Sequence, residues 1–158
     1  MKLKKGEIII HPRQGACRIK KVLPRRIVLR PCFNKGSRLT IFIPKKNIEK
    51  IGLRSLKTKK EVLQALKNLN ARVKVQKLEY SREELREWFE KGDLESLSRA
   101  ILELYKNIYV NEDNRVSQKK LLERTINFLA EEVAAVQGMS KKEARKKILD
   151  RLRRTFGC

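Results

Sequence analysis

The chain has 158 residues, enough for one ordinary domain or two small ones, and its 40 Lys and Arg against 18 Asp and Glu give a formal net charge of +22. Like charges oppose folding, so we expect a polyanionic partner, with nucleic acid favoured over an anionic membrane surface. No apolar run approaches the roughly 20 residues that span a bilayer, and the N-terminus lacks the apolar stretch of a secretion signal. The sequence therefore excludes a membrane-spanning protein and favours a cytoplasmic one.

Short runs of β-branched residues alternate with proline and glycine over residues 1–56. All four prolines lie in this half, at the expected strand ends and turns. The pattern predicts strands over 7–11, 16–23, 26–30 and 39–43, and residues 51–53 are a candidate for a fifth. We expect a small curled antiparallel sheet or barrel.

The hydrophobic period changes from 2 to 3.6 near residues 54–58, which sets the domain boundary. Residues 57–80 are predicted to contain a helix capped by Thr58, with Val62, Leu63, Leu66 and Leu69 along one face, and then a polar connector over 70–80. Further helices are predicted to begin at Ser81, Asp93, Ser117 and Ser140. The fold class is therefore α+β, with a β domain over 1–56 and a compact all-α domain over 57–158.

The positive charge is concentrated in the predicted β domain. Residues 1–56 contain 16 Lys and Arg against only Glu7 and Glu49. The helical half is less biased, but Lys141–Arg154 holds eight cations and two acids. That tract adds nonspecific DNA contacts or is the solvated face of a terminal helix, and we favour the second interpretation slightly.

Neither a metal site nor a catalytic constellation is visible. Cys17, Cys32 and Cys158 show no C-x-x-C spacing, and His11 is the only histidine, so four zinc ligands cannot be gathered. We expect Cys17 and Cys32 to be buried thiols rather than a disulfide. No triad-like order, glycine-rich phosphate loop or paired-aspartate motif occurs. The sequence predicts a protein that is not an enzyme and uses no cofactor, metal or small-molecule substrate.

Several segments, taken together in their order and spacing, resemble the sequence pattern of a known family. They are Gly6–Gly15 (G-[DE]-x-[VI]-V-Y-P-x-H-G in the family), Leu39–Pro44 (LTVRVP), Ile51–Arg54 (VGVR), Lys91–Leu94 with Ala100–Tyr105 (SGD…VVRDLY), and Leu121–Leu122 with Phe128–Val133 (ML…ILVGELA). In these segments the chain resembles the CarD family of bacterial transcription regulators. That family shares its N-terminal module with the polymerase-interacting domain of transcription-repair coupling factors. The likeness spans residues 1 to about 150.

The resemblance implies a Tudor-like barrel that binds the β subunit of RNA polymerase. It also implies a helical domain that touches promoter DNA at the upstream edge of the melted bubble and stabilises the open complex. An aromatic side chain enters the minor groove there, and basic side chains hold the flanking phosphates. Such a protein is cytoplasmic and associated with the nucleoid, and a monomer is the simplest expectation.

For polymerase binding, the sequence and the resemblance single out Arg25, Arg26, Ile27 and Phe42. We expect the first three at an exposed sheet edge, where a partner strand can pair through main-chain bonds. Arg25 falls where the family places a docking arginine, whereas Phe42 replaces a basic family residue. The alternative is that these are ordinary solvent-facing strand residues.

For DNA binding, Tyr80 takes the position of the family's wedge tryptophan. Trp88 is an alternative wedge, although we favour it as a core residue that packs with Leu85 and Phe89. Helix N-termini also offer free amides to phosphates. The full set of expected DNA contacts is Tyr80, Arg82, Arg86, Lys119, Lys120 and Arg124.

Two other functions remain open at this stage. The charge of residues 1–56 also fits a general DNA- or RNA-binding protein with a Tudor- or KOW-like barrel. The chain is alternatively a polymerase adaptor whose helical half binds another protein.

Overall fold

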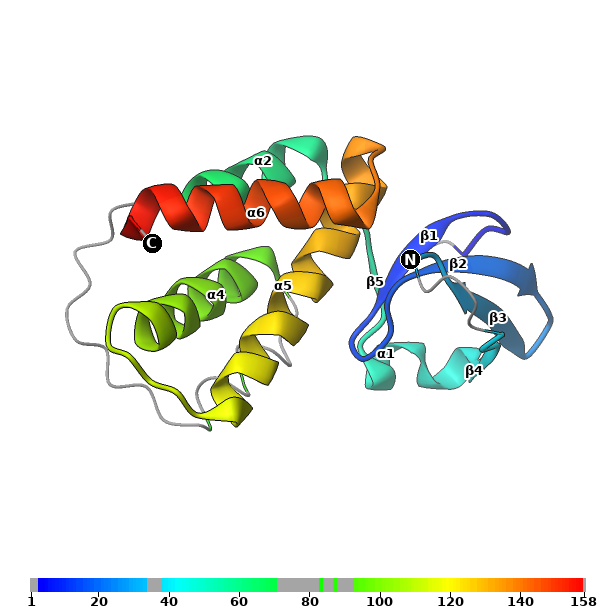
Figure 1. Ribbon diagram of the computed structural model, residues 1–158. Helices are drawn as coiled ribbons and strands as arrows, with labels where there is room; N and C mark the ends of the chain where they lie inside the picture. The colour runs from blue at the N-terminus through cyan, green and yellow to red at the C-terminus, as the bar shows by residue number, and fades with distance from the viewer. Residues whose placement is uncertain (1–2, 34–37, 71–82, 84–86, 88–92, 158) are drawn as a thin grey trace. The chain divides into compact units, whose positions relative to one another are not determined.

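The structure, a computed structural model, describes residues 3–33, 38–70, 83, 87 and 93–157 (Figure 1). The chain divides into two compact units, Met1–Lys57 and Thr58–Cys158. We call them the sheet unit and the helical unit. Their boundary lies one residue from the predicted position. An antiparallel sheet followed by helices confirms the α+β class.

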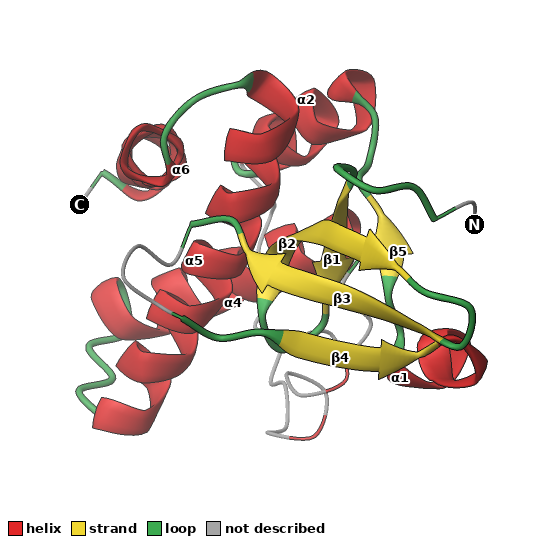
Figure 2. Cartoon of the chain, turned by 90° about the vertical axis from the view of Figure 1, so that its right-hand side faces the viewer, coloured by secondary structure: helices red, strands yellow, loops and turns green. Residues whose placement is uncertain are grey.

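The sheet unit is built on five antiparallel strands (Figure 2). They are β1 (Ile8–His11), β2 (Gly15–Val22), β3 (Arg26–Pro31), β4 (Ile41–Pro44) and β5 (Arg54–Ser55). Their order in the sheet is β4-β3-β2-β1-β5, so β4 and β5 are the two edges. The sheet is open, and the predicted closed barrel is not confirmed.

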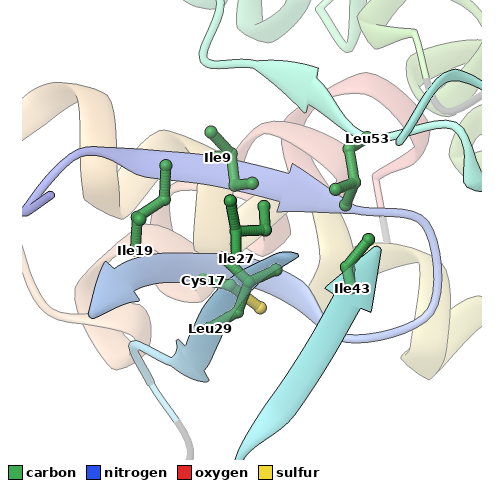
Figure 3. Packing of buried hydrophobic residues seen from close by; sticks show 7 residues of the cluster. All are labelled: Ile9, Cys17, Ile19, Ile27, Leu29, Ile43 and Leu53. Atoms are coloured by element: carbon green, nitrogen blue, oxygen red, sulfur yellow. The ribbon is translucent and has the colours of Figure 1, made fainter. Parts of the chain in front are cut away.

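One face of the sheet carries the core of this unit (Figure 3). Alternation along the strands places buried side chains opposite one another in register, as in the Ile19↔Leu29 and Ile27↔Ile43 pairs. Full burial of each such side chain contributes roughly 1.5–3 kcal/mol. The cluster consists of Ile9, Cys17, Ile19, Ile27, Leu29, Ile43 and Leu53.

The cysteine expectation is confirmed for Cys17 and only partly for Cys32. Cys17 is a fully buried thiol, Cys32 is a half-buried thiol, and neither is part of a disulfide. Cys17 lies on β2 among the core side chains (Figure 3). Its role is therefore that of a small apolar residue.

The predicted strand over 51–53 is wrong. A short 3-10 helix, η1 (Lys45–Asn47), leads into one helical turn, α1 (Ile48–Ile51). Ile48 and Ile51, three residues apart, both pack against the core cluster. Gly52 ends the turn at φ +89°, a conformation that favours glycine, and only then does the chain reach β5.

The helical unit contains α2 (Lys59–Asn68), α4 (Leu94–Tyr109), α5 (Val116–Gln137) and α6 (Lys141–Phe156). Three predicted N-caps are confirmed, because a side-chain oxygen accepts the backbone amide three residues on. The pairs are Thr58 with Glu61 at 3.2 Å, Asp93 with Ser96 at 2.8 Å and Ser140 with Glu143 at 3.1 Å.

Two helix details differ from the prediction. Helix α5 begins at Val116 rather than Ser117, and its N-cap, Arg115, makes no side-chain capping bond. Leu63, expected on the buried face of α2, is 47% exposed, while Val62, Leu66 and Leu69 are buried. The buried stripe of α2 is therefore narrower than its sequence suggests.

Helix α6 contacts α2 near the C-terminal ends of both helices. The Thr155 hydroxyl and the Arg151 guanidinium of α6 donate to the carbonyl oxygens of Leu69 and Leu66 at the end of α2. The buried Ser98 hydroxyl of α4 donates to the Ala65 carbonyl of α2 at 3.2 Å. None of the helices in the described ranges is long and apolar enough to cross a membrane.

Candidate protein and nucleic-acid interface

The predicted edge around Arg25–Ile27 is not an edge. β3 lies between β2 and β4, and its residues Arg26 and Ile27 pair with Pro44 and Ile43 of β4. The Ile27 side chain is fully buried in the core cluster, so it cannot contact a partner. The sequence identifies a strand here but carries no local sign that β4 will cover it. The edge available on this side is β4 itself (Figure 2).

Phe42 stands on this edge with its ring 55% exposed. The guanidinium carbon of Arg26 lies 4.9 Å from the ring centroid, within the range of a cation–π contact. The direct partner of Phe42 on the neighbouring strand β3 is Val28. Arg26 lies two residues before Val28 and therefore contacts the ring diagonally. An exposed aromatic ring backed by an arginine is typical of the side chains that dominate protein interfaces.

Arg25 lies in the turn between β2 and β3, and its side chain is exposed. Its carbonyl oxygen accepts the Lys45 amide at 2.9 Å, which places it beside the end of β4. Arg25 and Arg26 therefore lie beside β4, the strand that carries Phe42. We call β4 with these three residues the β4 edge.

A second group of cations lies on the sheet face opposite the core. Arg18 of β2 and Arg30 of β3 are direct cross-strand partners, and both are exposed. Lys21, also exposed, is the partner of Val28 two pairs further along. We call Arg18, Arg30 and Lys21 the arginine row. These three residues were not among the contacts predicted from the sequence, although Arg18 alternates with the buried Cys17 and Ile19.

On the helical unit, the described DNA-contact candidates are Lys119, Lys120 and Arg124. All three are exposed on the first half of α5. Lys120 and Arg124 are four residues apart, a spacing that places them on one helix face. The remaining candidates, and the alternative wedge, lie outside the described residues: Tyr80, Arg82, Arg86 and Trp88.

Part of the basic tract Lys141–Arg154 contacts the rest of the helical unit. Lys141 pairs with Glu131 at 3.3 Å, and Arg145 pairs with Glu123 at 2.7 Å. Arg151 donates to α2, as described above. Five of the eight cations are exposed: Lys142, Lys146, Lys147, Arg153 and Arg154. Three cations of the tract thus anchor α6, and most of the tract faces solvent.

His11 is a turn residue rather than a base. Its Nδ1 accepts the backbone amides of Arg13 at 3.0 Å and Gln14 at 3.2 Å, which closes the turn between β1 and β2. Burial, and secondarily the charge of Arg13, lower the pKa of His11 from its ordinary value. Within the described ranges, no cluster of three or more His, Cys, Asp or Glu side chains could hold a metal ion.

A hollow of about 410 Å³ lies beside β5 in the sheet unit. Lys45, Lys46 and Arg54 contribute positive charge to its wall, and Glu49 contributes negative charge. This mixed lining does not define one ligand.

Comparison with known proteins adds no further assignment. No protein-family model matches the chain, and no curated protein matches it.

Proposed function

We propose that the chain is a transcription regulator of the CarD type, with a Tudor-like sheet unit. In this proposal the β4 edge binds the β subunit of bacterial RNA polymerase. The helical unit binds promoter DNA near the upstream edge of the bubble and stabilises the open complex. The ordered series of family-like segments over residues 1 to about 150 supports the proposal.

The main support for binding of the polymerase β subunit is the composition of the β4 edge. An edge strand offers unpaired main-chain groups to a partner strand, and neighbouring side chains then give specificity. Phe42 stands where the family has a basic residue, but Arg26 brings a guanidinium to within 4.9 Å of that ring. The charge expected at this position is therefore supplied by a neighbouring strand.

The DNA part is supported by the exposed cations of α5 and by the family position of Tyr80. An apolar or aromatic wedge favours a base step that is already unstacked, and it needs no base-specific contact. Arg82 and Arg86 follow Tyr80 in the sequence and complete the proposed contact. We propose that the protein acts by binding alone, as a cytoplasmic, nucleoid-associated monomer.

The test measures the lifetime of the open promoter complex after a heparin challenge, with and without the protein. We expect the protein to lengthen it, and Tyr80→Ala to remove about 1–3 kcal/mol of that stabilisation, as for a stacked aromatic. Tyr80→Phe, which keeps the ring, should retain most of it. Equal lifetimes with and without the protein would contradict the proposal.

A second candidate is a general DNA- or RNA-binding protein. Residues 1–57 hold 17 Lys and Arg against two Glu, which favours any polyanion. Arg25→Glu separates the two functions, because it should abolish capture of the purified β subunit under the first proposal. Tight binding of unrelated duplexes with no affinity for the β subunit would favour the second.

A further inference from the structure

We infer that the arginine row is a second nucleic-acid site, which binds the phosphate backbone through the sheet unit itself. It lies on the face of the sheet opposite the core. This goes beyond the proposed function, in which the helical unit supplies the DNA contacts and the sheet unit binds protein.

Arg18 and Arg30 face each other across β2 and β3. The next pair along, Ile19 and Leu29, is fully buried in the core, so the two arginines project from the other face. Directly opposite residues in an antiparallel pair are only about 5 Å apart. The backbone positions that carry the two guanidinium groups are therefore neighbours on an exposed surface.

This placement is unfavourable without a ligand. Like charges directly opposite each other destabilise a sheet. Arg18 is nevertheless held in place, because its Nη1 donates to the Gly6 carbonyl oxygen at 2.7 Å. A guanidinium has five N–H donors, so other donors remain for an anion. A phosphate between the two arginines would relieve their repulsion and accept charge-assisted hydrogen bonds from both.

A register shift adds a third cation to the same face. Regular alternation from Arg18 would turn Lys21 toward the core. The shift between Ile19 and Lys21 instead makes Lys21 the partner of Val28. Val28 lies between the core residues Ile27 and Leu29, so it belongs to the opposite face. The irregularity therefore places Lys21 on the same face of the sheet as Arg18 and Arg30. Bulges commonly change the direction of a side chain in this way.

The acids of the sheet unit lie elsewhere. Glu7 and Glu49 are the only Asp or Glu among residues 1–57. The Glu7 carbonyl accepts the Ile19 amide at 2.8 Å, so Glu7 is level with Ile19 and alternation assigns it to the core face. Glu49 lies on α1. The row is therefore charged with one sign only.

Nucleic acid fits this surface better than an acidic protein. Protein interfaces depend on apolar or aromatic anchors and are depleted in lysine. The three side chains of the row are all cations. Phe42, the exposed aromatic residue of the β4 edge, lies on the same face, as the partner of Val28, but it is at the rim of the sheet and the row has no apolar side chain of its own. A phosphate backbone requires charge and hydrogen-bond donors alone.

The experiment uses the full chain and a labelled 20-base-pair duplex of arbitrary sequence, without polymerase. Its dissociation constant is measured between 50 and 200 mM salt for Arg18→Gln/Arg30→Gln. We expect affinity to fall on the order of 10-fold and the slope of log K against log salt to decrease by about one to two, since each phosphate contact contributes about 0.9.

The matched control is Arg13→Gln/Lys50→Gln, which removes two exposed cations from the β1–β2 turn and α1 of the same unit. It should change affinity less than about 2-fold. Equal losses in both double variants, or an unchanged salt slope in the first, would overturn the inference. Capture of the first variant by the purified β subunit is measured separately, and loss of that capture with DNA binding intact would also overturn the inference and assign the row to a protein.

Folding is checked by the melting temperature of each variant, which should be unchanged or slightly higher once the Arg18–Arg30 repulsion is removed. If the double variant melts lower, Arg30→Gln alone gives the test, because it keeps the Arg18–Gly6 bond. A single variant with wild-type affinity and salt slope would also overturn the inference. Polymerase is absent from the binding assay, so failure here leaves the proposed function untouched.

Discussion

The Arg26 guanidinium is stacked on the Phe42 ring, 4.9 Å from its centroid, on the edge of an otherwise cationic sheet. This contact favours one orientation of the exposed ring before any partner arrives. Such preorganisation lowers the entropic cost of binding. It also explains how a large apolar side chain can stay on the surface of this unit.

Phe42→Ala should therefore weaken binding of the polymerase β subunit by at least about 10-fold, as for loss of an interface hot spot. The free energy of unfolding should fall by no more than about 1 kcal/mol, the usual size of an exposed cation–π contact. Surface-immobilised β subunit and chemical denaturation give the two quantities. Val116→Ala, which removes an equally exposed apolar side chain from α5, is the control and should bind normally. Wild-type binding by Phe42→Ala would exclude the β4 edge as the docking surface.

His11 should make the stability of the chain depend on pH near neutrality. Its pKa is lowered in the folded protein, mainly by burial, so the unfolded chain takes up the proton first as pH falls. The free energy of unfolding is then highest above about pH 7, and it decreases through the ordinary histidine pKa near 6.5 toward the lowered value. Protonation also removes the acceptor for the Arg13 and Gln14 amides.

His11→Asn provides the measurement, because an Asn oxygen can accept amides two or three residues on without titrating. Urea denaturation from pH 5 to 8 should give a flatter curve for this variant than for the wild type. Since the chain has one histidine, no other imidazole contributes. Parallel curves for the two proteins would contradict the assignment.

Local signals in the sequence predicted the helix ends well. Thr58, Asp93 and Ser140 were recognised as N-caps because capping involves residues three apart, and each makes the expected bond. The same holds for Gly138, which ends α5 in a left-handed conformation. Such features depend on a few neighbouring residues, which a single sequence contains.

Non-local pairing could not be predicted in the same way. Arg25–Ile27 was expected at a sheet edge that could pair with a partner strand, but which strand lies beside β3 depends on the whole sheet. The pairing of Arg18 with Arg30 depends on register, and the position of Lys21 depends on a shift that no residue type announces. The candidate surfaces were therefore only partly visible in the sequence: Arg25, Arg26 and Phe42 were predicted as contacts, whereas the arginine row was not.

Asp113 stabilises the turn between α4 and α5 through its charged carboxylate. The free energy of unfolding should therefore depend on pH in the acid range. Its carboxylate accepts bonds from the Arg115 side chain, from the Arg115 amide and from Asn107. The Arg115 side chain foremost, then its amide, lower the pKa of Asp113 to about 2. The stabilisation is complete above the ordinary aspartate pKa of 3.8 and is lost as pH falls toward 2.

Asp113→Asn should therefore be less stable than the wild type by a constant amount above about pH 5, and the difference should shrink as the pH drops from 4 to 2. Denaturation followed by helical circular dichroism measures it. Asp150→Asn is the control, since its contact with Arg153 is long, at 3.8 Å, and both side chains are well exposed. A difference that stays constant down to pH 2 would show that Asp113 acts through something other than its charge.

The two leucines of α2 test how the helical unit is held together. Leu66 is 1% exposed, whereas Leu63, three residues earlier, is 47% exposed. Leu66→Ala should lower the free energy of unfolding by about 2–5 kcal/mol through lost burial and the cavity left behind. Leu63→Ala should change it by less than about 0.5 kcal/mol. Both substitutions keep a strong helix former and preserve the Leu66 carbonyl that accepts from Arg151, so the contrast isolates side-chain burial. Similar losses in the two variants would mean that α2 packs on the face predicted from the sequence, with Leu63 inside.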